Sequence, residues 1–575
     1  MPAFSPTIGK FGDVTARGKP WTLWYKRHKK HFYIGLTIAC MCLIGVSGWL
    51  YWQSRYIPAP GGTLVEGIVG FPQRLNPLFS GQNEVDADLT PLIFRGVMKY
   101  DENQELVPDL AENVERSDDG KTYTLTLGDH KWHDGQPVTA NDVAFTIKLA
   151  QSEDYHGTWS GSFTGVEVSI NNEKSLTLEL KDAYAPFDQN LTMGILPSHL
   201  LSGKSITQIA SDPFNLEPIG NGKLEFESIL TNPETDTIET LSFQLHDGYI
   251  KQIQFNFYPS LDDAMTDFKL GKIHALGTTY DPEIKLLDDF DKQQREGVLK
   301  GQTYGLYFNL ASDSVKDIKV RKALSHSLPK EQILNKVLSN HYDQMNGVYS
   351  KDHWATSDSY DVFAYNEAEA KNIWDETEDR PSTITLLVPD KPIHKATADQ
   401  IAASWQKRGI EVSVMVKSGS EIADLVESGS GFDVVLIGEK FRPDPDRYNN
   451  WHSTQSPPIG LNISRLSNDR VDKALEDART TFDENERKVK YATFQDYLAR
   501  EAAGIFLGGN PYGSLFRFLG AYRKGAGLRL PEGAVGRPRP APETPRRLLA
   551  PRLLSGSAVR SEGAEGGRRT SGHPV

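Results

Sequence analysis

A run of twenty residues without a charged side chain, 33–52, is the feature that most limits how this 575-residue chain can fold. Such a run is long enough to cross a bilayer as one helix. Tyrosine and tryptophan residues lie near both of its ends, as they do at membrane interfaces, and the lysines and arginines cluster before it. We therefore predict a basic cytoplasmic segment at 1–32, a transmembrane anchor at 33–53, a linker at 54–62 and an extracytoplasmic body beyond them.

Two kinds of export signal compete with the anchor interpretation. A cleaved signal peptide would have a shorter apolar core and small residues at its cleavage site, whereas this run ends in Trp-Leu-Tyr-Trp. A lipoprotein signal would place its cysteine just after the apolar core, whereas Cys40 lies in the middle of it. Cys40 and Cys42 are the only cysteines, so the body has neither a disulfide framework nor a cysteine-based metal site.

The charge of the chain is unevenly distributed. Residues 1–32 carry seven Lys and Arg against one acid, and residues 511–575 carry twelve against four. Subtracting these contributions from the total of −13 leaves −27 for residues 33–510. A body this acidic does not suit binding along a phosphate backbone, so we expect no nucleic-acid partner.

A cluster of motifs at 96–147 has a clear local structure. Residues 118–120 (Asp-Asp-Gly) predict a turn, and the alternation that follows predicts a strand at Thr122–Leu127. Residues 132–135 (Trp-His-Asp-Gly) predict another turn. The helix expected at Ala140–Ala150 begins after a threonine, a residue that often caps helices.

This cluster resembles the signature of the extracellular solute-binding proteins of family 5, the peptide-binding subunits of ATP-driven ABC importers. Further pieces that resemble the family follow in its order. They are LNP (75–77), ILPSH (195–199), PIGNG (218–222), FNFYPSLDDAMTDFKLGKIHAL (255–276), LYFNL (306–310), DIKVRKALSHSLPKEQIL (317–334), YNEAEAKNIW (365–374), GFDVVLIG (431–438), WHSTQ (451–455) and GLNISRLSNDRVDKALEDAR (460–479).

The resemblance implies an α/β fold of the two-lobed, periplasmic-binding-protein-like type II class, with an inserted third subdomain, preceded here by one transmembrane helix. It places the first lobe at 61–92 and 200–303, the inserted subdomain at 93–199 and the second lobe at 304–505. The ligand is then enclosed between the lobes. Short apolar strands alternate with helical stretches throughout this region, which agrees with an α/β fold.

The resemblance also shows where the chain departs from the family. Family members hold a peptide by its main chain and pair its α-amino group with an aspartate in an Asp-Tyr-x-Asp/Glu-Pro segment. The matching segment here is 438–446, and the anchoring position holds Phe441 or Arg442, depending on the alignment. Neither is an acid, so the usual anchor is absent.

Three interpretations of this departure remain open. An acid at a shifted position, Glu439, Asp444 or Asp446, could substitute for the anchor. Alternatively, Arg442 could receive a carboxylate or another anionic group. In the third, Arg442 and Arg447 only neutralise nearby acids on a solvated loop.

Four further side chains are candidates for the ligand cleft. Trp451 could supply an apolar face and His452 a polar contact, although a tryptophan beside a histidine is often packing. Asn309, in the strand at the hinge, is a reasonable cleft residue. Trp159, in a loop rich in glycine and serine, could form a lip of the cleft or only an exposed loop.

No motif of an enzyme or metal site stands out. We interpret residues 132–134 (Trp-His-Asp) as structural, and residues 220–222 (Gly-Asn-Gly) as a turn, because no Lys-Ser/Thr pair follows to make a phosphate loop. There is no HExxH motif and no spaced histidine cluster. We therefore expect neither a cofactor nor catalysis.

The last part of the chain, 508–575, has a different composition. Residues 511–575 hold eleven arginines and no Asp, Asn, Ile or Gln, and they are rich in Gly, Pro and Ala. These favoured residues share GC-rich codons. We predict out-of-frame or foreign sequence, or else a genuine basic disordered tail. In the family the chain returns to the first lobe here, so loss of this return would expose a sheet edge.

The leading expectation is a monomeric, membrane-anchored binding protein that captures oligopeptides by hinge closure. It would deliver them to an importer built from permease and ATPase subunits. Alternatives on the same scaffold are a non-peptide solute, such as a nickel complex, haem or an oligosaccharide, and a surface receptor that senses peptides. A surface hydrolase would need a catalytic constellation that the sequence does not display.

Overall fold

The computed structural model describes most of the chain from residue 29 to residue 516. The described residues are 29–47 without 32, 35 and 39, 61–278 without 102 and 247, 293–338, 345, 347–351, 353–357 and 363–516. All of them belong to one compact unit within Met1–Arg537. The predicted linker up to residue 60, nearly all of the predicted cytoplasmic segment and residues 517–575 of the predicted tail lie outside the described residues.

The apolar run near the N-terminus forms a helix. It spans Lys29–Ser47, and its 19 residues are long and apolar enough to cross a membrane. The helix begins four residues before the predicted anchor, and residues 48–53 are outside the described part. Length and composition agree with an anchor, and a signal sequence would have the same features.

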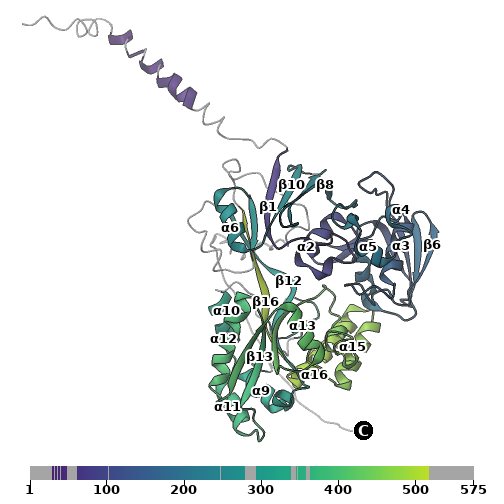
Figure 1. Ribbon diagram of the computed structural model, residues 1–575, viewed down its shortest axis with the longest axis vertical. Coiled ribbons are helices and arrows are strands. Elements are labelled where there is room, and N and C mark those ends of the chain that lie inside the picture. The colour runs from purple at the N-terminus through teal and green to yellow at the C-terminus, as the bar shows by residue number, and fades with distance from the viewer. Residues whose placement is uncertain are drawn as a thin grey trace, which may run out of the picture. The chain divides into compact units, whose positions relative to one another are not determined.

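One mixed ten-stranded sheet runs through both lobes (Figure 1), in the order β14-β13-β15-β12-β16-β11-β1-β10-β9-β8. In the first lobe β1 pairs in parallel with β10 and β11, whereas β9 is antiparallel to β10 and to β8. These strands are β1 (Thr63–Val69), β8 (Leu224–Thr231), β9 (Ile238–Leu245), β10 (Gln252–Tyr258) and β11 (Ala275–Thr278).

Two longer helices of the first lobe begin and end at residues that stabilise helix termini. Asn83 caps α2 (Glu84–Ile93) by accepting the amide hydrogen of Val85. Ser260 caps α6 (Leu261–Leu270), which ends at Gly271 in the left-handed conformation. The short helices are η1 (Ser80–Gln82), α4 (Ser198–Leu201), α5 (Ile206–Ala210) and η3 (Pro213–Asn215).

The region predicted as an inserted subdomain contains its own antiparallel sheet, in the order β4-β5-β7-β6. The predicted strand Thr122–Leu127 (β5) and the predicted helix Ala140–Ala150 (α3) are confirmed with these bounds. Thr139 and Asp142 form a capping box at the start of α3. The other elements are β2 (Met98–Tyr100), β3 (Leu106–Pro108), β4 (Ala111–Arg116), β6 (Glu167–Asn172), β7 (Ser175–Glu179) and η2 (Ala185–Thr192).

The second lobe has helices on both faces of its strands. Its strands are β13 (Thr383–Pro389), β14 (Glu411–Lys417) and β15 (Val434–Lys440), and β13 is parallel to both neighbours. Its helices are α8 (Asp313–Lys316), α9 (Ile318–His326), α10 (Lys330–Leu338), α11 (Glu367–Asp375), α12 (Pro392–Gln406), α13 (Gly419–Ser428), α14 (Tyr448–Trp451), η4 (Ser453–Gln455), α15 (Asp469–Thr480) and α16 (Glu484–Glu501).

The hydrophobic cores follow this arrangement. One large core serves the first lobe and the inserted subdomain, since Phe243 and Phe255 of the large sheet belong to the same cluster as Tyr123 of the small sheet. A smaller core packs α6 of the first lobe, around Phe268, against β11. The second lobe has two principal cores. Leu386 of β13 points into one of them and Leu387 into the other, as alternate residues of a strand do.

Two long strands, β12 (Gln293–Phe308) and β16 (Gly504–Phe516), join the lobes. β12 pairs with β15 in the second lobe, and β16 pairs with β11 in the first. Between them, the pairing is irregular from Val298 to Thr303, where β12 has more residues than β16. The predicted boundary at 303/304 falls inside β12.

The prediction for the start of the tail needs correction. Residues 508–516, expected to be disordered or out of frame, are ordered as backbone of β16 and pair with β11 and β12, so only the expected disorder is corrected, and the out-of-frame origin stays a prediction. The returning strand is therefore present. The physical reason is that backbone hydrogen bonds depend little on side-chain identity, and this strand closes two sheet edges that would otherwise be open.

Candidate functional site

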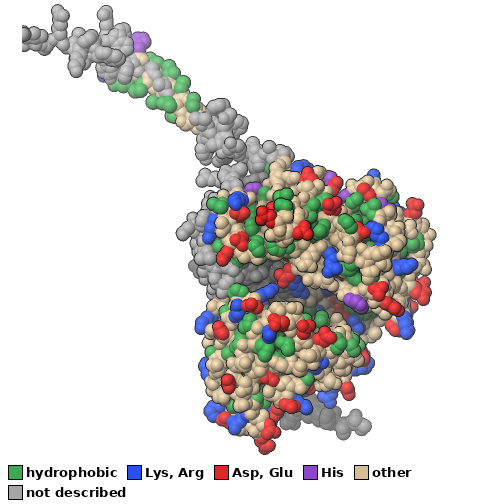
Figure 2. Space-filling view, in the orientation of Figure 1, with side chains coloured by type: hydrophobic (Ala, Val, Ile, Leu, Met, Phe, Trp, Pro, Cys, Tyr) green, Lys and Arg blue, Asp and Glu red, His purple; other side chains and the backbone are tan. Residues whose placement is uncertain are grey.

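The segment 438–447 begins in the last residues of β15 and reaches the inserted subdomain. In β15, Glu439 is the register partner of Thr303 in β12, so the segment begins beside the strand that joins the lobes. Figure 2 shows a furrow between the two lobes, with acidic and basic side chains on its walls. This cleft is the candidate ligand site.

One acid of the segment is fixed by an arginine. The guanidinium of Arg487 in α16 donates to both carboxylate oxygens of Asp444, at 3.0 Å each. Arg487 also donates to the hydroxyl of Tyr491 at 3.1 Å. The charge of Asp444 is therefore already compensated, and the forked geometry fixes the segment.

A second acid, Asp446, is also paired, and its pairing crosses the cleft. Arg479 of α15 donates from Nε to Asp446 at 2.9 Å, and the hydroxyl of Tyr184 donates to the same carboxylate at 3.0 Å. Tyr184 directly precedes η2 in the inserted subdomain, so this contact holds the two lobes together. The Arg479 guanidinium also lies 4.0 Å from the ring centre of Tyr448.

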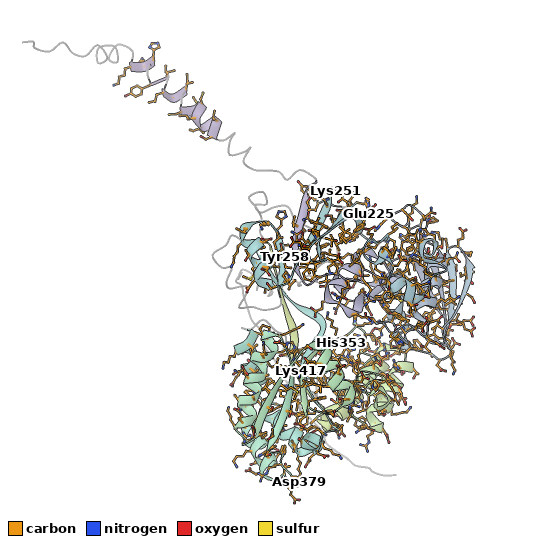
Figure 3. All side chains as sticks on the ribbon, viewed as in Figure 1. Glu225, Lys251, Tyr258, His353, Asp379 and Lys417 are labelled. Atoms are coloured by element: carbon orange, nitrogen blue, oxygen red, sulfur yellow. The ribbon has the colours of Figure 1, made fainter. Side chains whose placement is uncertain are left out.

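Further contacts within the second lobe hold the segment in place. Arg447 is buried and donates to the main-chain carbonyls of Asp444 and Asp446, at 3.0 Å each. Its guanidinium lies 3.9 Å from the ring centre of Phe441. His353, labelled in Figure 3, donates from Nε2 to the carbonyl of Pro443 at 2.9 Å, while burial lowers its pKa to about 4.

Glu439 has a different environment from the two aspartates. It accepts a hydrogen bond from the hydroxyl of Tyr307 at 2.7 Å and a long one from Asn450 at 3.4 Å. No lysine, arginine or histidine in the described part of the chain forms an ion pair with it. Burial raises the pKa of Glu439 to about 7, despite these hydrogen bonds and a weaker attraction from Arg447.

Arg442 has no acidic partner among the described residues. It donates from Nη1 to the side-chain oxygen of Asn190 at 2.8 Å, and its guanidinium lies 4.1 Å from the ring centre of Trp159. Trp159 is held by the first lobe, since its indole donates to the carbonyl of Pro77 at 3.1 Å. Burial lowers the pKa of Arg442, and the hydroxyl of Tyr100 partly opposes this effect.

The structure thus brings together six of the predicted site residues. Glu439, Phe441, Arg442, Asp444 and Asp446 share the segment, and Trp159 meets it from the other lobe. Arg447 does not neutralise the neighbouring carboxylates directly, because it donates to carbonyl groups instead.

Three other residues predicted to line the cleft are buried within the second lobe, and their contact with a ligand stays a prediction. Trp451 has an exposed fraction of 1% and packs against Tyr307 and Phe506 in the second lobe. Asn309, also 1% exposed, donates to two main-chain carbonyls and accepts an amide hydrogen. His452, 4% exposed, caps η4 and contacts α15. Each one satisfies packing or backbone groups inside the lobe.

The first-lobe wall adds acids that the sequence reasoning missed. Burial and the neighbouring Asp88 raise the pKa of Glu66, in β1, to about 7. Burial also raises the pKa of Asp88, and Lys440 across the cleft opposes that rise. A glutamate inside the apolar strand TLVEGIV was the signal available. Glu84 forms another contact between the lobes, 3.6 Å from Lys391.

The histidine and glycine motifs have the structural roles predicted for them. The Nδ1 atom of His133 accepts the amide hydrogen of Gly220 at 3.2 Å, and its Nε2 donates to the carbonyl of Gly222 at 3.1 Å. The two turns therefore support each other. Across the described residues, no group of three or more His, Cys, Asp or Glu side chains is placed to hold a metal ion.

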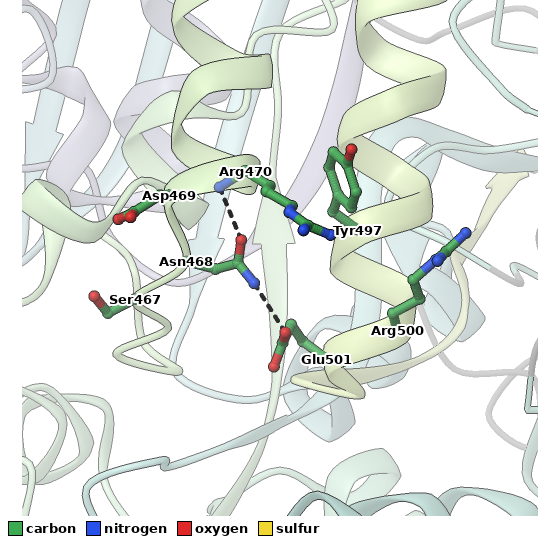
Figure 4. Close-up of a pocket in the computed structure, with 7 residues that line it drawn as sticks. All are labelled: Ser467, Asn468, Asp469, Arg470, Tyr497, Arg500 and Glu501. Atoms are coloured by element: carbon green, nitrogen blue, oxygen red, sulfur yellow. Dashed lines mark hydrogen bonds between the residues drawn. The ribbon is translucent and has the colours of Figure 1, made fainter.

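A pocket of about 370 Å³ lies apart from the cleft, between the start of α15 and the end of α16 (Figure 4). Asn468 caps α15 by accepting the amide hydrogen of Arg470, and it donates to Glu501 at 2.8 Å. The Arg470 guanidinium lies 5.6 Å from the ring centre of Tyr497. The polar groups of this pocket are thus engaged with each other.

Two lobes joined by two strands around a charged cleft define a solute-binding protein of the periplasmic type. The chain belongs to the bacterial extracellular solute-binding proteins, family 5, whose model matches residues 105–458. This confirms the family resemblance and the fold class expected from the sequence.

Individual relatives agree with this assignment. The chain is 25% identical over 478 residues to the oligopeptide-binding protein AppA of Bacillus subtilis. This match covers 78% of this chain and 86% of AppA. The structure of that AppA with a nonapeptide gives a TM-score of 0.68 at 24% identity, covering 80% and 95% of the two chains. NikZ from Campylobacter jejuni with Ni(L-His) gives 0.68 at 25% identity, covering 79% and 94%.

Proposed function

We propose that this protein is a membrane-anchored, extracytoplasmic binding protein that captures oligopeptides between its lobes and delivers them to an ABC importer. It performs no bond chemistry, and the energy of transport comes from its ATPase partners. The N-terminal helix Lys29–Ser47 provides the anchor. AppA, described as an oligopeptide-binding protein, supports the peptide class of ligand.

The observation that carries the proposal is the set of contacts across the cleft. Tyr184 bonds to Asp446, Asn190 to Arg442 and Glu84 to Lys391, and each pair joins opposite sides. Among the described residues, two strands, β12 and β16, join these sides through the sheet. Such an arrangement supports hinge closure, in which these contacts form when the lobes approach each other.

Glu439 is the acid that best replaces the missing anchor of the family. Asp444 and Asp446 already have arginine partners, whereas Glu439 has hydrogen bonds but no cation. A half-buried carboxylate without a cation is costly, and the α-ammonium of a peptide would compensate it. The raised pKa of Glu439 has the same physical origin.

A non-peptide solute is the second candidate. The observation that favours it is Arg442, which in one of the two alignments takes the position where the family resemblance implies an acid. NikZ, described in complex with Ni(L-His), illustrates a non-peptide ligand on a similar fold.

Native mass spectrometry of the full chain, purified in detergent, tests the proposal. We expect a heterogeneous set of short peptides to be released from the protein. A single discrete non-peptide mass would refute peptide capture and favour the second candidate. Deletion of the gene should also abolish uptake of the released peptides by cells.

A further inference from the structure

The arginines in and around the segment 438–447 differ in the groups that accept their hydrogen bonds. Arg479 and Arg487 each donate to a carboxylate. Arg447 donates to two main-chain carbonyls. A buried guanidinium normally needs such acceptors, because its five N–H groups lose their water on burial.

Arg442 does not follow this pattern. Among the described residues its one hydrogen bond goes to the neutral amide of Asn190, and its guanidinium carbon lies over the ring of Trp159. Asn190 is itself held, since its amide nitrogen donates to the carbonyl of Ser162 at 2.9 Å. The guanidinium is thus positioned from the other side of the cleft, while most of its N–H groups have no acceptor in the described structure.

The nearest acids of the same segment cannot rotate to Arg442 without losing their own partners. Asp444 would lose the two bonds from Arg487, and Asp446 would lose those from Arg479 and Tyr184. Arg442 is half-buried, so its remaining N–H groups are open to an anion other than these two carboxylates.

We propose that Arg442 is a carboxylate-binding residue of the cleft, and that the ligand therefore carries an anionic group. This inference rests on the proposed function, and in a peptide the group is the free C-terminal carboxylate or an acidic side chain. The planar fork of a guanidinium matches the two oxygens of a carboxylate. Trp159 holds the plane of this fork by stacking, and Asn190 holds one of its edges.

Glu439 and Arg442 lie three residues apart in the segment, so a ligand that contacts both would meet one acid and one arginine. Such a pair selects a zwitterion, since a neutral or singly charged solute would leave one of the two groups without a partner. Specificity in this cleft would then depend on the amino group and the carboxylate of the ligand.

The test measures capture of peptides with blocked carboxylates. A peptic digest of casein is offered untreated, after methyl esterification of its carboxylates and after acetylation of its amines. The full chain in detergent is incubated with each pool, and bound peptides are eluted and quantified by mass spectrometry. The variants are Arg442→Gln, Arg442→Lys and the matched control Arg465→Gln, whose guanidinium bonds to carbonyls such as that of Glu427.

We expect the wild-type chain to capture at least about 10-fold less of the esterified pool than of the untreated pool, as loss of a charge-assisted hydrogen bond implies. Arg442→Gln should capture little of either pool and distinguish them less than about 2-fold, and Arg442→Lys should be intermediate. Arg465→Gln should behave as wild type, and thermal unfolding should show that every variant is folded.

Different results would refute the role of Arg442 and the proposed function. Equal capture of the untreated and esterified pools by the wild-type chain would overturn the role of Arg442 and leave peptide capture intact. Retained discrimination in folded Arg442→Gln would overturn it as well. Capture of no peptide from any pool would refute the proposed function, and with it this inference.

Discussion

Peptide binding should depend on pH through Glu439. In the free protein the pKa of this carboxyl is raised from 4.5 to about 7, which corresponds to at most about 3 kcal/mol against the ionised form. An ammonium bound to the carboxylate favours ionisation and lowers this pKa. Binding at pH 6 should therefore release nearly one proton.

The sign and size of the effect follow from this linkage. Between pH 7 and pH 6 the affinity should fall about 5-fold, and about 10-fold more between pH 6 and pH 5, because the free carboxyl becomes protonated. Above about pH 8 the affinity should fall again as the α-amino group of the peptide loses its proton. The affinity should thus be greatest between about pH 7 and pH 8.

Isothermal titration calorimetry with a peptide recovered from the protein measures both quantities, since buffers of different ionisation enthalpy report the released proton. In Glu439→Gln the acidic limb should disappear, and the affinity near pH 7.5 should be about 10- to 100-fold lower, as expected for a lost charge-assisted hydrogen bond. The N-acetylated peptide should show neither limb.

Glu421→Gln is the matched control. Glu421 is exposed at the start of α13, and hydrogen bonds from Lys417 and Ser418 lower its pKa to about 2. Its substitution should leave the acidic limb of binding unchanged. Equal affinity of the wild-type chain at pH 5 and pH 7 would refute the reasoning, as would an acidic limb that persists in Glu439→Gln.

Three further predictions concern the support of the cleft. Arg487→Met should lower the free energy of unfolding by about 3–5 kcal/mol in chemical denaturation, because it leaves the Asp444 carboxylate unpaired, and Asp444→Asn in the same chain should restore most of the loss. Tyr184→Phe should weaken ligand binding about 2- to 10-fold in calorimetry through loss of one hydrogen bond across the cleft, with an unchanged melting temperature. Gly222→Ala should lower the melting temperature because its new methyl group would lie 2.4 Å from a carbonyl oxygen, whereas Gly419→Ala, with open space around it, should not.

The sequence predicts much of the fold because the local patterns of strands and helix caps agree with the family motifs, which follow in order along the chain. The strand Thr122–Leu127 alternates in burial, and the helix Ala140–Ala150 begins with a capping box, so both elements are local. Residues 508–516 of the returning strand β16 were wrongly predicted to be disordered, whereas their out-of-frame origin stays a prediction. The sequence of these residues does not resemble a strand pattern. Pairing with β11 and β12 on either side is what makes this segment a strand.

The candidate site was predictable only along one segment of chain. The departure from the family motif identified Glu439 and Arg442, because both lie where the motif would be. Asn309 and Trp451 have partners inside the second lobe, since a polar or aromatic residue near a hinge can as well satisfy the interior of a lobe. Tyr184 could not be found from sequence, because it meets the segment only through the tertiary fold.

The irregular pairing between Val298 and Thr303 has a consequence for the motion of the lobes. Paired backbone lies on both sides of it, with a further register shift at Tyr304/Gly305, so each lobe keeps its own backbone hydrogen bonds when the other rotates. Rotation at this interruption requires no ladder to break. The balance between open and closed forms is then decided at the walls of the cleft, where a single bound charge can shift it.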